Sequence, residues 1–319
     1  MKNKTILFIT NNFPPIVDGV GDYTYKLAQA LGKQGVEVSI LCSSKPDIIE
    51  NIKVFEAEGI NVFPIVNGWD FKGMKVIQNV FKNEKYDLIS LQYVPFSFQN
   101  KGLPIRLGGH LKTLFPDTNW HIMFHELWVG MGKNAIIKSK IHGYLQKQLI
   151  SSMIKQIKPS LINTHCHLYK WQLNKIGFDV TILPLFSNIQ KTNKIIKPKG
   201  RAKEFKTMVF SVFGSIHFGA PVKLFIKELS IFLDKHNGEY INAKFIFIGN
   251  CGAHLNEWVS VLKENNIDFE ITGKLSEISI TKHLNSTNFG ITTTPYILVE
   301  KSGTVAAMLE HNLNVSKIN

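Results

Sequence analysis

The fold is decided at residues 5–42, where the sequence reads TILFITNNFPPIVDGVGDYTYKLAQALGKQGVEVSILC. The first six letters form a short apolar run that is typical of a buried strand. Residues 21–33 then place Tyr25, Ala28 and Leu31 at helical spacing, and Gly35 is a helix stop. A second apolar run over 36–42 predicts the next strand. A strand, a helix and a strand in this order are the unit from which parallel sheets are built.

The same alternation extends along both halves of the chain. In the first half, apolar runs predict strands over 61–65, 88–92, 121–125, 160–164 and 181–184. In the second half they predict strands over 208–213, 244–249, 269–272 and 289–293, and another that begins at Val315. Helical patterns cover 222–235, 255–265, 276–285 and 304–311. The predicted fold class is α/β, with two doubly wound, Rossmann-like domains that face each other across a cleft.

A lysine-rich polar segment separates the two halves and contains Pro198-Lys199-Gly200, which is typical of a linker. We therefore predict a first domain over 1–190, a basic linker over 191–206 and a second domain over 207–319. The second domain is shorter than the roughly 150 residues usual for such a unit. We expect this end of the sequence to be truncated. We also expect marginal stability or self-association, because a sheet edge and apolar surface would lie uncovered.

Composition restricts the class of protein. Of the 319 residues, 44% are hydrophobic and 19% are charged, which is enough to bury a core and excludes a disordered chain. Cys42, Cys166 and Cys251 form no C-x-x-C pair, so neither a disulfide framework nor a zinc site is predicted. No run approaches the roughly 20 apolar residues that span a bilayer, and no signal peptide is evident. We expect a protein of the reducing cytoplasm with no bound metal.

Positive charge is concentrated in one part of the chain. The net charge is +13, and residues 127–178 contain no Asp or Glu. Eight lysines fall there: Lys133, Lys138, Lys140, Lys147, Lys155, Lys158, Lys170 and Lys175. Such a field attracts phosphate groups on nucleic acid, anionic lipid or substrate. Nucleic acid is not expected as a partner, because no aromatic-interleaved basic motif is present.

The basic segment 134–158 is predicted to be a helix with one apolar stripe. The stripe consists of residues four apart with lysines between them: Ile137, Ile141, Leu145, Leu149, Met153 and Ile157. One interpretation is a helix that packs on the sheet through this stripe and exposes its lysines. The other is a protein docked on an anionic membrane surface, peripheral on the inner face of the membrane.

The loop after the first strand is the first candidate for chemistry. It reads Phe13-Pro14-Pro15-Ile16-Val17-Asp18-Gly19-Val20-Gly21, and a glycine-bearing turn ahead of a helix lets backbone N–H groups approach an anion. A plain turn that needs glycine for φ > 0 is the simpler explanation, but this loop is longer than a tight turn requires. It is not a dinucleotide fingerprint, because Thr24 occupies the third glycine position and no acid follows the second strand.

Together with Leu27-Ala28-Gln29-Ala30-Leu31 and Gly35-Val36-Glu37-Val38, this loop resembles the opening of GT-B glycosyltransferases of the family-4 type. The resemblance implies a nucleoside diphosphate sugar as donor, retention of anomeric configuration, and no metal or other cofactor. It implies that the glycine loop lines the cleft, with Gly19 and Gly21 toward the donor. Val20, Asp22 and Gln92 are then expected on the acceptor side.

His125-Glu126 stands at the end of the predicted strand 121–125. Residues at the carboxyl ends of strands in an open α/β sheet face the ligand crevice. A lone histidine at a strand end is more often structural, but His125 is similar in position to the cleft histidine of the resembled family, which contacts the transferred sugar or the acceptor. We therefore predict His125 as the catalytic residue. Glu126 is predicted to orient it or to bind acceptor.

Ser302-Gly303-Thr304 opens an alanine-rich helix downstream of Pro295-Tyr296. A helix N-terminus presents free N–H groups and a favourable dipole to a diphosphate, although Ser or Thr is also an ordinary N-cap. The segment resembles the family's donor motif of two glutamates separated by seven residues. Glu310 matches the second glutamate, which holds the ribose, and Ser302 occupies the position of the first.

A second departure from the family lies at Phe213-Gly214-Ser215-Ile216. Ser215 and Ala220 occupy the positions of the arginine and lysine that clamp the diphosphate in the family, and Lys223 or Lys301 would have to replace them. Such contacts are typically worth several kcal/mol in a dry site. The predicted donor site comprises Gly19, Gly21, Gly214, Ser215, Pro295, Tyr296, Lys301, Ser302, Gly303, Thr304 and Glu310.

The predicted function is transfer of a sugar from the nucleotide sugar to a glycan, lipid or other acceptor. The departures leave an alternative open, a catalytically inactive subunit that binds a nucleotide or glycan. A third interpretation is a sugar-nucleotide epimerase on the same fold, which would release nucleotide without any acceptor.

Overall fold

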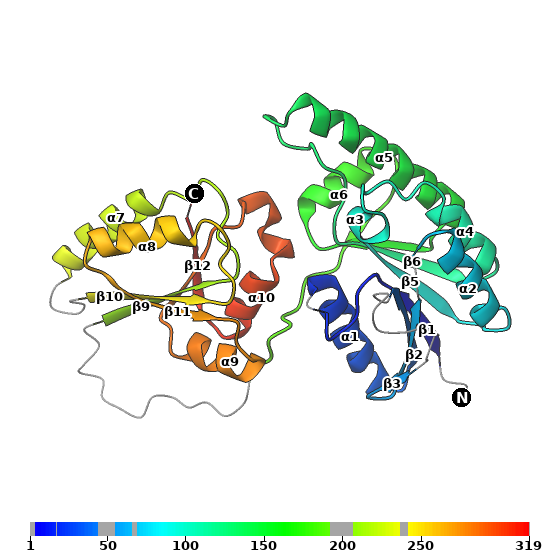
Figure 1. Ribbon diagram of the computed structural model, residues 1–319, viewed down its shortest axis with the longest axis horizontal. Coiled ribbons are helices and arrows are strands. Elements are labelled where there is room, and N and C mark those ends of the chain that lie inside the picture. Colours follow the sequence, from blue (N-terminus) through cyan, green and yellow to red (C-terminus); the bar gives the residue numbers. More distant parts are fainter. Residues whose placement is uncertain are drawn as a thin grey trace. The chain divides into compact units, whose positions relative to one another are not determined.

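The computed structural model describes residues 4–16, 18–43, 55–65, 69–191, 207–236 and 242–318. The chain divides into two compact units, Met1–Pro184 and Leu185–Asn319, both visible in Figure 1. Each unit is a mainly parallel sheet with helices on its faces, the arrangement that alternating strands and helices favour.

In the first unit the strands lie in the order β3-β4-β2-β1-β5-β6-β7-β8. Their bounds are β1 Thr5–Ile9, β2 Glu37–Ser43, β3 Phe55–Ala57, β4 Ile60–Ile65, β5 Leu88–Tyr93, β6 Asn119–Phe124, β7 Leu161–Thr164 and β8 Thr181–Ile182. Among these described strands, neighbours pair in parallel except β3 and β4, which are antiparallel. The strand order reverses between β1 and β5. Open α/β sheets bind ligands at the carboxyl ends of strands beside such a reversal.

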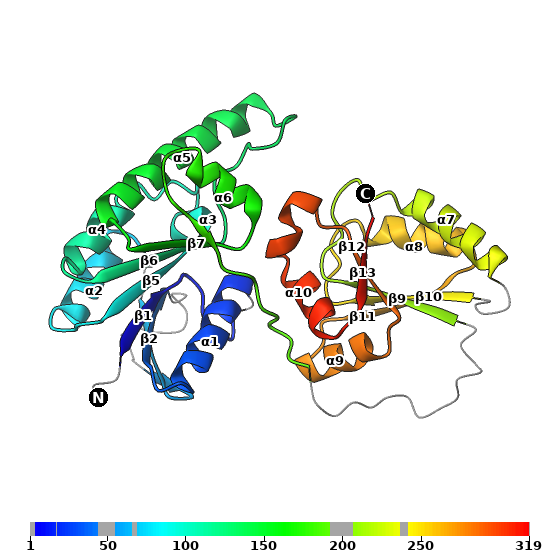
Figure 2. The ribbon, with the colours of Figure 1, turned by 180° about the vertical axis from the view of Figure 1, so that it is seen from behind.

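The helices of the first unit cover both faces of this sheet. They are α1 Gly19–Gly32, α2 Phe71–Phe81, α3 Pro95–Phe98, α4 Leu107–Leu114, α5 Ile137–Ile157 and α6 His167–Asn174. Helices α2, α4 and α5 lie on one face and α1 lies on the other, as Figures 1 and 2 show from opposite sides. Helices α4 and α5 approach closely because Gly108 has no side chain. A Cβ at Gly108 would lie 2.9 Å from the Cα of Met153.

The second unit repeats the plan with the strand order β11-β10-β9-β12-β13, in which the described neighbours are parallel. The strands are β9 Thr207–Phe213, β10 Asn242–Ile248, β11 Asp268–Gly273, β12 Phe289–Thr292 and β13 Asn314–Lys317. The helices are α7 Val222–Lys235, α8 Leu255–Glu264, α9 Glu277–Asn285 and α10 Gly303–Glu310, with a short 3-10 helix, η1, over Tyr296–Lys301. The strand order reverses between β9 and β12.

The two faces of the second sheet bury different side chains. Phe210, Phe245 and Phe247 pack in one cluster with Trp258 of α8, whose ring meets Phe247 edge-on at 6.1 Å between centroids. Ile248 belongs to a separate cluster on the opposite face, with buried side chains of α9 and α10. Successive residues of β10 point to opposite faces, as the pleat requires.

The predicted α/β class with two doubly wound sheets is confirmed. In the second unit, the predicted strands and helices coincide with the observed ones to within one or two residues, and α7 matches at both ends. In the first unit the sequence analysis missed β3, α2, α3, α4 and α6. Most of the predicted linker 191–206 lies outside the described residues, so that boundary stays a prediction. Ile189 packs against the core of the second unit, and the Gln190 carbonyl accepts a hydrogen bond from Thr281 at 3.2 Å.

The predicted packing stripe of α5 is buried only in the last part of the helix, where Met153 and Ile157 are buried as expected. At the start of the helix Ile137 is 76% exposed, and Gly143 and Gln146 are buried instead of the stripe. The reason is geometric: residues four apart advance by about 40° around a helix, so five such steps rotate the direction by about 200°. The first part of α5 therefore exposes a surface that we call the α5 patch. Its members are the exposed apolar residues Ile136, Ile137, Ile141, Tyr144 and Leu145 with the exposed lysines Lys133, Lys138 and Lys140.

Candidate functional site

The loop after β1 leads into α1, and Asp18 closes the first turn of this helix. The Asp18 carboxylate accepts a hydrogen bond from the Gly21 N–H at 3.0 Å and so caps the helix. Close packing requires glycine at 21, since a Cβ there would lie 2.7 Å from the Asn12 carbonyl oxygen, whereas Gly19 faces open space. Because Asp18 places a carboxylate at this helix end, the turn suits a neutral, hydroxyl-bearing ligand better than a phosphate.

The residues predicted on the acceptor side lie at the same edge of the first sheet. Val20 and Asp22 are half-buried in the first turn of α1, and the Thr24 hydroxyl donates to the Val20 carbonyl at 2.7 Å. Gln92 lies near the end of β5 and is buried, while Glu126 is exposed directly after β6.

His125 is a buried member of a hydrogen-bonded chain. Its Nε2 atom lies 2.8 Å from the Gln92 side-chain amide, and its Nδ1 atom lies 3.2 Å from Nε2 of His165. Nδ1 of His165 is in turn 2.8 Å from the Leu183 carbonyl oxygen. The ring of Tyr23 in α1 meets both imidazoles edge-on, with 5.1 Å between centroids in each case. In this structure a substrate reaches Nε2 of His125 only by displacing the Gln92 amide.

The series of hydrogen-bonded side chains continues from Gln92 into the first sheet beneath His125. The Gln92 amide lies 2.7 Å from the Ser90 hydroxyl, which lies 2.8 Å from Nδ1 of His121. Burial lowers the pKa of His121 to about 4, and contact with Asn163 opposes this shift. His121 is therefore neutral near pH 7. Burial also raises the pKa of Tyr23 to about 12, so its hydroxyl stays protonated.

Sequence reasoning missed His165. The signal was present, because His165 follows β7 as His125 follows β6, and the register pairs Phe124 with Thr164. Residues that follow paired positions on neighbouring parallel strands come out at the same edge of the sheet. The strand prediction alone did not pair β6 with β7, and that pairing is what brings the two histidines together.

In the second unit the predicted donor residues gather at the start of α10. Ser302 is the N-cap, and its hydroxyl accepts from the Val305 N–H at 3.4 Å. The same hydroxyl lies 3.1 Å from the Thr304 hydroxyl and 3.5 Å from that of Thr294. Gly214, with φ +80°, lies so close that a Cβ on it would be 2.7 Å from Cγ2 of Thr304. The turn after β9 and the start of α10 are therefore in direct contact.

Backbone hydrogen bonds hold this turn to its neighbours. The Gly214 N–H donates to the Ile248 carbonyl at 3.0 Å, and the Ile216 N–H donates to the Cys251 carbonyl at 2.9 Å. The His217 N–H donates to the Thr293 hydroxyl at 2.8 Å. The ends of β9, β10 and β12 thus form one rim beside α10, which is the ligand-binding edge of such a sheet.

Other predicted donor residues lie further from this rim or face solvent. Ser215 and Tyr296 are exposed, and Lys301 is half-buried at the end of η1. Glu310 is the last residue of α10 and is exposed, about 10 Å along the helix axis from Gly303. The structure therefore brings Gly214, Ser302 and Thr304 together and leaves Glu310 at the opposite end of the helix. Pro295 stands at the N-cap of η1.

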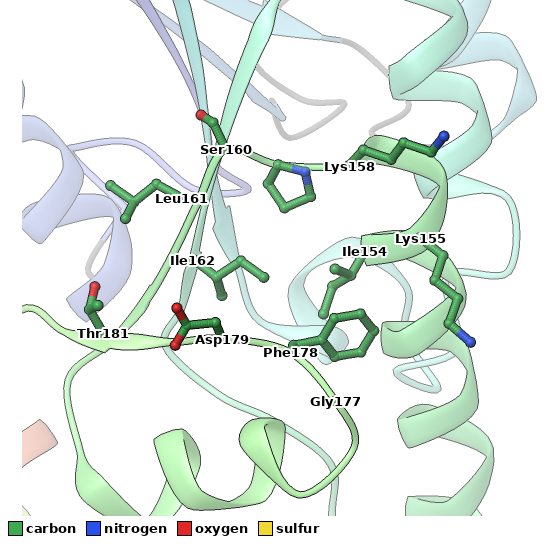
Figure 3. A pocket seen from close by; sticks show the side chains of 11 residues that line it. Ile154, Lys155, Lys158, Ser160, Leu161, Ile162, Gly177, Phe178, Asp179 and Thr181 are labelled. Carbon is green, nitrogen blue, oxygen red and sulfur yellow. The ribbon is translucent and has the colours of Figure 1, made fainter.

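A pocket of about 600 Å³ lies at the opposite edge of the first sheet (Figure 3). The end of α5 and the beginnings of β7 and β8 line it, with Lys155, Lys158 and Asp179 among the polar side chains. It lies at the amino ends of the strands, away from His125. Within the described ranges, no group of three or more His, Cys, Asp or Glu side chains is placed to hold a metal ion. No described helix is both long and apolar enough to cross a membrane.

Solved structures with the same fold cover almost the whole chain. The catalytic domain of starch synthase IV from Arabidopsis thaliana, bound to ADP and acarbose, has a TM-score of 0.62 at 10% identity, over 99% of this chain and 83% of that chain. TarM has a TM-score of 0.60 at 9% identity, over 98% and 84%. A UDP-forming α,α-trehalose-phosphate synthase from Burkholderia xenovorans, in complex with glucose-6-phosphate, has a TM-score of 0.57 at 9% identity, over 98% and 83%.

No family model matches the sequence, and no curated protein does. At identities near 10% the structural similarity shows the fold alone, which is that of GT-B glycosyltransferases. Activity, the family-4 assignment and the individual site residues stay predictions.

Proposed function

We propose that this protein transfers a sugar from a nucleoside diphosphate sugar to a glycan or lipid-linked acceptor in the cytoplasm. The observation that carries the proposal is the contact between the Gly214 turn and Thr304 at the start of α10. A helix N-terminus with free N–H groups, flanked by hydroxyls, is suited to a diphosphate. The bound ADP of the similar starch synthase and the UDP-forming activity named for the similar synthase support a nucleotide as ligand.

The two units have different roles in this proposal. The second unit holds the diphosphate through backbone N–H groups near Gly214 and through the start of α10, with Lys223 or Lys301 as counter-charge. Charge that develops on the leaving diphosphate is then met by fixed dipoles and hydroxyls instead of an arginine–lysine clamp, which predicts a slower reaction than a clamped site would give. Glu310 reaches the ribose only if the nucleoside extends along α10. Retention without a metal follows from the family resemblance.

The first unit supplies the acceptor side. His125 presents an imidazole at the carboxyl edge of β6, where it can accept a hydrogen bond from a sugar hydroxyl once the Gln92 amide is displaced. The Asp18 carboxylate at the start of α1 favours hydroxyl groups over phosphates in the adjoining turn. The proposal therefore assigns the uncharged part of the substrates to this unit.

The first test is thermal unfolding with UDP, GDP, ADP and dTDP, each added separately. A site filled to a hundred times its dissociation constant stabilises the folded state by about 2.7 kcal/mol. We expect one nucleotide to raise the melting temperature and the Gly214→Ala variant to lose that rise. The corresponding nucleotide sugar is then supplied with candidate acceptors, and transfer is followed by release of nucleotide. Absence of a shift with every nucleotide, in a folded sample, would refute a donor site.

The alternative, an inactive nucleotide- or glycan-binding subunit, is favoured by Ser215, Ala220 and Ser302 at the positions of charged family residues. Turnover separates the two. Binding of one nucleotide without transfer to any acceptor in a broad panel supports the inactive subunit. Release of nucleotide in the absence of acceptor indicates the epimerase. Transfer that depends on both substrates supports the glycosyltransferase.

The acceptor part of the proposal includes an anionic membrane surface as the place of reaction. Helix α5 connects parallel strands β6 and β7, so it runs opposite to them and begins at the carboxyl edge, where His125 lies. The exposed isoleucines of the α5 patch supply apolar area, and its lysines supply attraction to anionic lipid worth about 1 kcal/mol each. A lipid-linked acceptor would then be presented at the edge of the sheet that binds substrate.

Sedimentation with vesicles tests this part separately. We expect the protein to sediment with vesicles that contain phosphatidylglycerol at low salt, and not with pure phosphatidylcholine. A Lys138→Gln/Lys140→Gln variant should bind roughly tenfold more weakly or worse, from the loss of two lysines. Lys227→Gln/Lys263→Gln is the matched control, because both lysines are exposed but lie in α7 and α8 of the second unit. Equal sedimentation with both kinds of vesicle would refute the membrane surface.

A further inference from the structure

Two histidines meet at the carboxyl edge of the first sheet. His125 is 7% exposed and His165 is 3% exposed, and their rings lie 5.0 Å apart between centroids. The contact runs from Nδ1 of His125 to Nε2 of His165 at 3.2 Å. One of these nitrogens must donate and the other accept, so the protonation of one ring decides that of the other.

The Leu183 carbonyl decides the direction of this hydrogen bond. It lies 2.8 Å from Nδ1 of His165, and a carbonyl can only accept, so Nδ1 of His165 carries the proton. A neutral imidazole has a single N–H group, so Nε2 of His165 is an acceptor. His125 must then donate from its Nδ1 atom, which leaves Nε2 of His125 with the lone pair.

The other hydrogen bonds of the series, from His125 to His121, are compatible with a bare Nε2 on His125 if the Gln92 amide directs its NH₂ group toward His125. Gln92 then donates to Nε2 of His125, Ser90 donates to the Gln92 oxygen, and His121 donates from Nδ1 to Ser90. As positioned, the Gln92 side-chain oxygen faces Nε2 of His125. Since an amide oxygen only accepts hydrogen bonds, this orientation would require a proton on Nε2. The two ends of an amide are nearly identical in shape, and the hydrogen-bond network assigns them.

We propose that His165, anchored by the Leu183 carbonyl, is a positioning residue that holds His125 in the Nδ1–H tautomer, so that its Nε2 lone pair is presented to a substrate hydroxyl. The inference rests on the proposed function, in which His125 contacts the acceptor or the transferred sugar. Tyr23 adds steric support, because its ring lies against both imidazoles. Gln92 occupies Nε2 until a substrate hydroxyl replaces its NH₂ group as the donor.

The tautomer can be read without any substrate. Two-bond ¹H–¹⁵N correlation spectra of the full ¹⁵N-labelled chain at pH 8, above the ordinary histidine pKa, distinguish a protonated ring nitrogen from a bare one. The His125 signals are assigned by their loss in His125→Gln. We expect Nδ1 of His125 to be protonated and Nε2 to be bare. A His125 that is protonated on Nε2, alone or together with Nδ1, would overturn the proposal.

Variants at position 165 test the anchor. His165→Phe keeps an aromatic ring but removes the acceptor, so His125 should lose its Nδ1–H preference. His165→Gln offers an amide oxygen and should retain it. His167→Phe is the matched control, because His167 is exposed on α6 and lies two residues away. An unchanged His125 tautomer in a folded His165→Phe variant would refute the role of His165.

Steady-state kinetics of the His165 variants provide a further test. If transfer is observed, His165→Phe should lower kcat about tenfold or more, leave the donor KM within about twofold, and be partly rescued in His165→Gln. Equal kcat values for His165→Phe and the parent chain would contradict the proposal. If no transfer is found with any donor, the proposed function fails while the spectra still decide the tautomer, so the two failures are distinguishable.

Discussion

In the first unit, the strands nearest the candidate site bury Ser90, Gln92 and His121 in one hydrogen-bonded chain, whereas in the second unit β9 and β10 bury Phe210 and Phe245 in an aromatic stack. Both sheets have the same doubly wound plan. Burial of an aromatic ring contributes several kcal/mol to stability, while a buried hydrogen bond contributes only about 1 kcal/mol net and imposes a penalty when it is broken. The comparison indicates that the first unit places a hydrogen-bonded polar chain beneath its candidate site, where the second unit places aromatic rings.

The largest expected effect tests the aromatic stack. Phe245 is fully buried and stacks on Phe210 at 5.1 Å between centroids. Phe245→Ala should destabilise the second unit by about 3–5 kcal/mol, since transfer free energy and cavity formation add. Urea unfolding, with hydrogen exchange to assign the unit, measures this loss. Phe232→Ala is the control, because Phe232 is 40% exposed and should cost far less. Similar losses in both variants would break the comparison.

The next effect tests the polar chain through pH. His121 has a pKa of about 4 in the folded state and 6.5 in the unfolded chain. As pH falls, the unfolded state binds the proton first. Stability from this residue is therefore full above about pH 6.5 and is lost progressively down to about pH 4, by roughly 3 kcal/mol. His121→Gln should remove most of this acid dependence, measured by urea unfolding of the first unit at several pH values. His236→Gln, at an exposed site in α7's C-cap, should leave it unchanged.

Two glycines test the packing at the rim formed by the ends of β9, β10 and β12 beside α10. Gly214 and Gly219 have φ values of +80° and +79°, but only at Gly214 would a Cβ meet another side chain. Both alanine variants should lose about 1–2 kcal/mol to backbone strain. In Gly214→Ala the free energy of unfolding should fall by roughly 1–2 kcal/mol more, because the added Cβ meets Thr304. This variant should also lose nucleotide binding. Thermal unfolding with and without nucleotide checks this. Equal behaviour of the two variants would mean that the approach to Thr304 is unimportant.

The smallest effect compares two glycines of α1. A Cβ at Gly21 would lie 2.7 Å from the Asn12 carbonyl oxygen, while a Cβ at Gly19 would meet open space. Gly21→Ala should destabilise the first unit by about 1 kcal/mol. Gly19→Ala should be neutral or stabilise it by about 0.5 kcal/mol, because alanine favours helix. Chemical denaturation measures the change in the free energy of unfolding for each variant. Changes of opposite sign support the close approach of loop and helix, and changes of the same sign would contradict it.

Several elements followed from local sequence alone. Helix α7 was predicted at both ends because its apolar residues recur at helical spacing after Pro221, and β10 followed from an uninterrupted apolar run. Helix α4 was missed, since Gly108 and Gly109 are poor helix formers. Gly108 is present because Met153 of α5 packs directly against it, a contact about 45 positions away in the sequence. Such a residue is explained only by its partner.

The α5 patch is a second case in which local sequence did not reveal a distant packing partner. The series of apolar residues four apart indicated a helix, and the helix exists over Ile137–Ile157. Which face is buried was decided by the Gly143 contact, where a Cβ would lie against the Val129 carbonyl, and by Gln146, whose amide bonds the Val129 N–H and the Gly102 carbonyl. Neither residue is apolar, so hydrophobic periodicity did not identify the buried face in the first part of the helix, whereas Met153 and Ile157 near its end are buried as predicted.

By itself the sequence determined the strand–helix alternation, the two doubly wound units, the glycine loop, and the positions of His125 and Ser302 beside strand or helix ends. These follow from short-range rules: apolar periodicity, capping and turn residues. Only the tertiary structure decided that His165 meets His125, that Gly214 meets Thr304, and that the first part of α5 exposes Ile137 and Ile141. These depend on which strands pair and on how the helices pack beside them, and both are set by contacts between residues far apart in the chain.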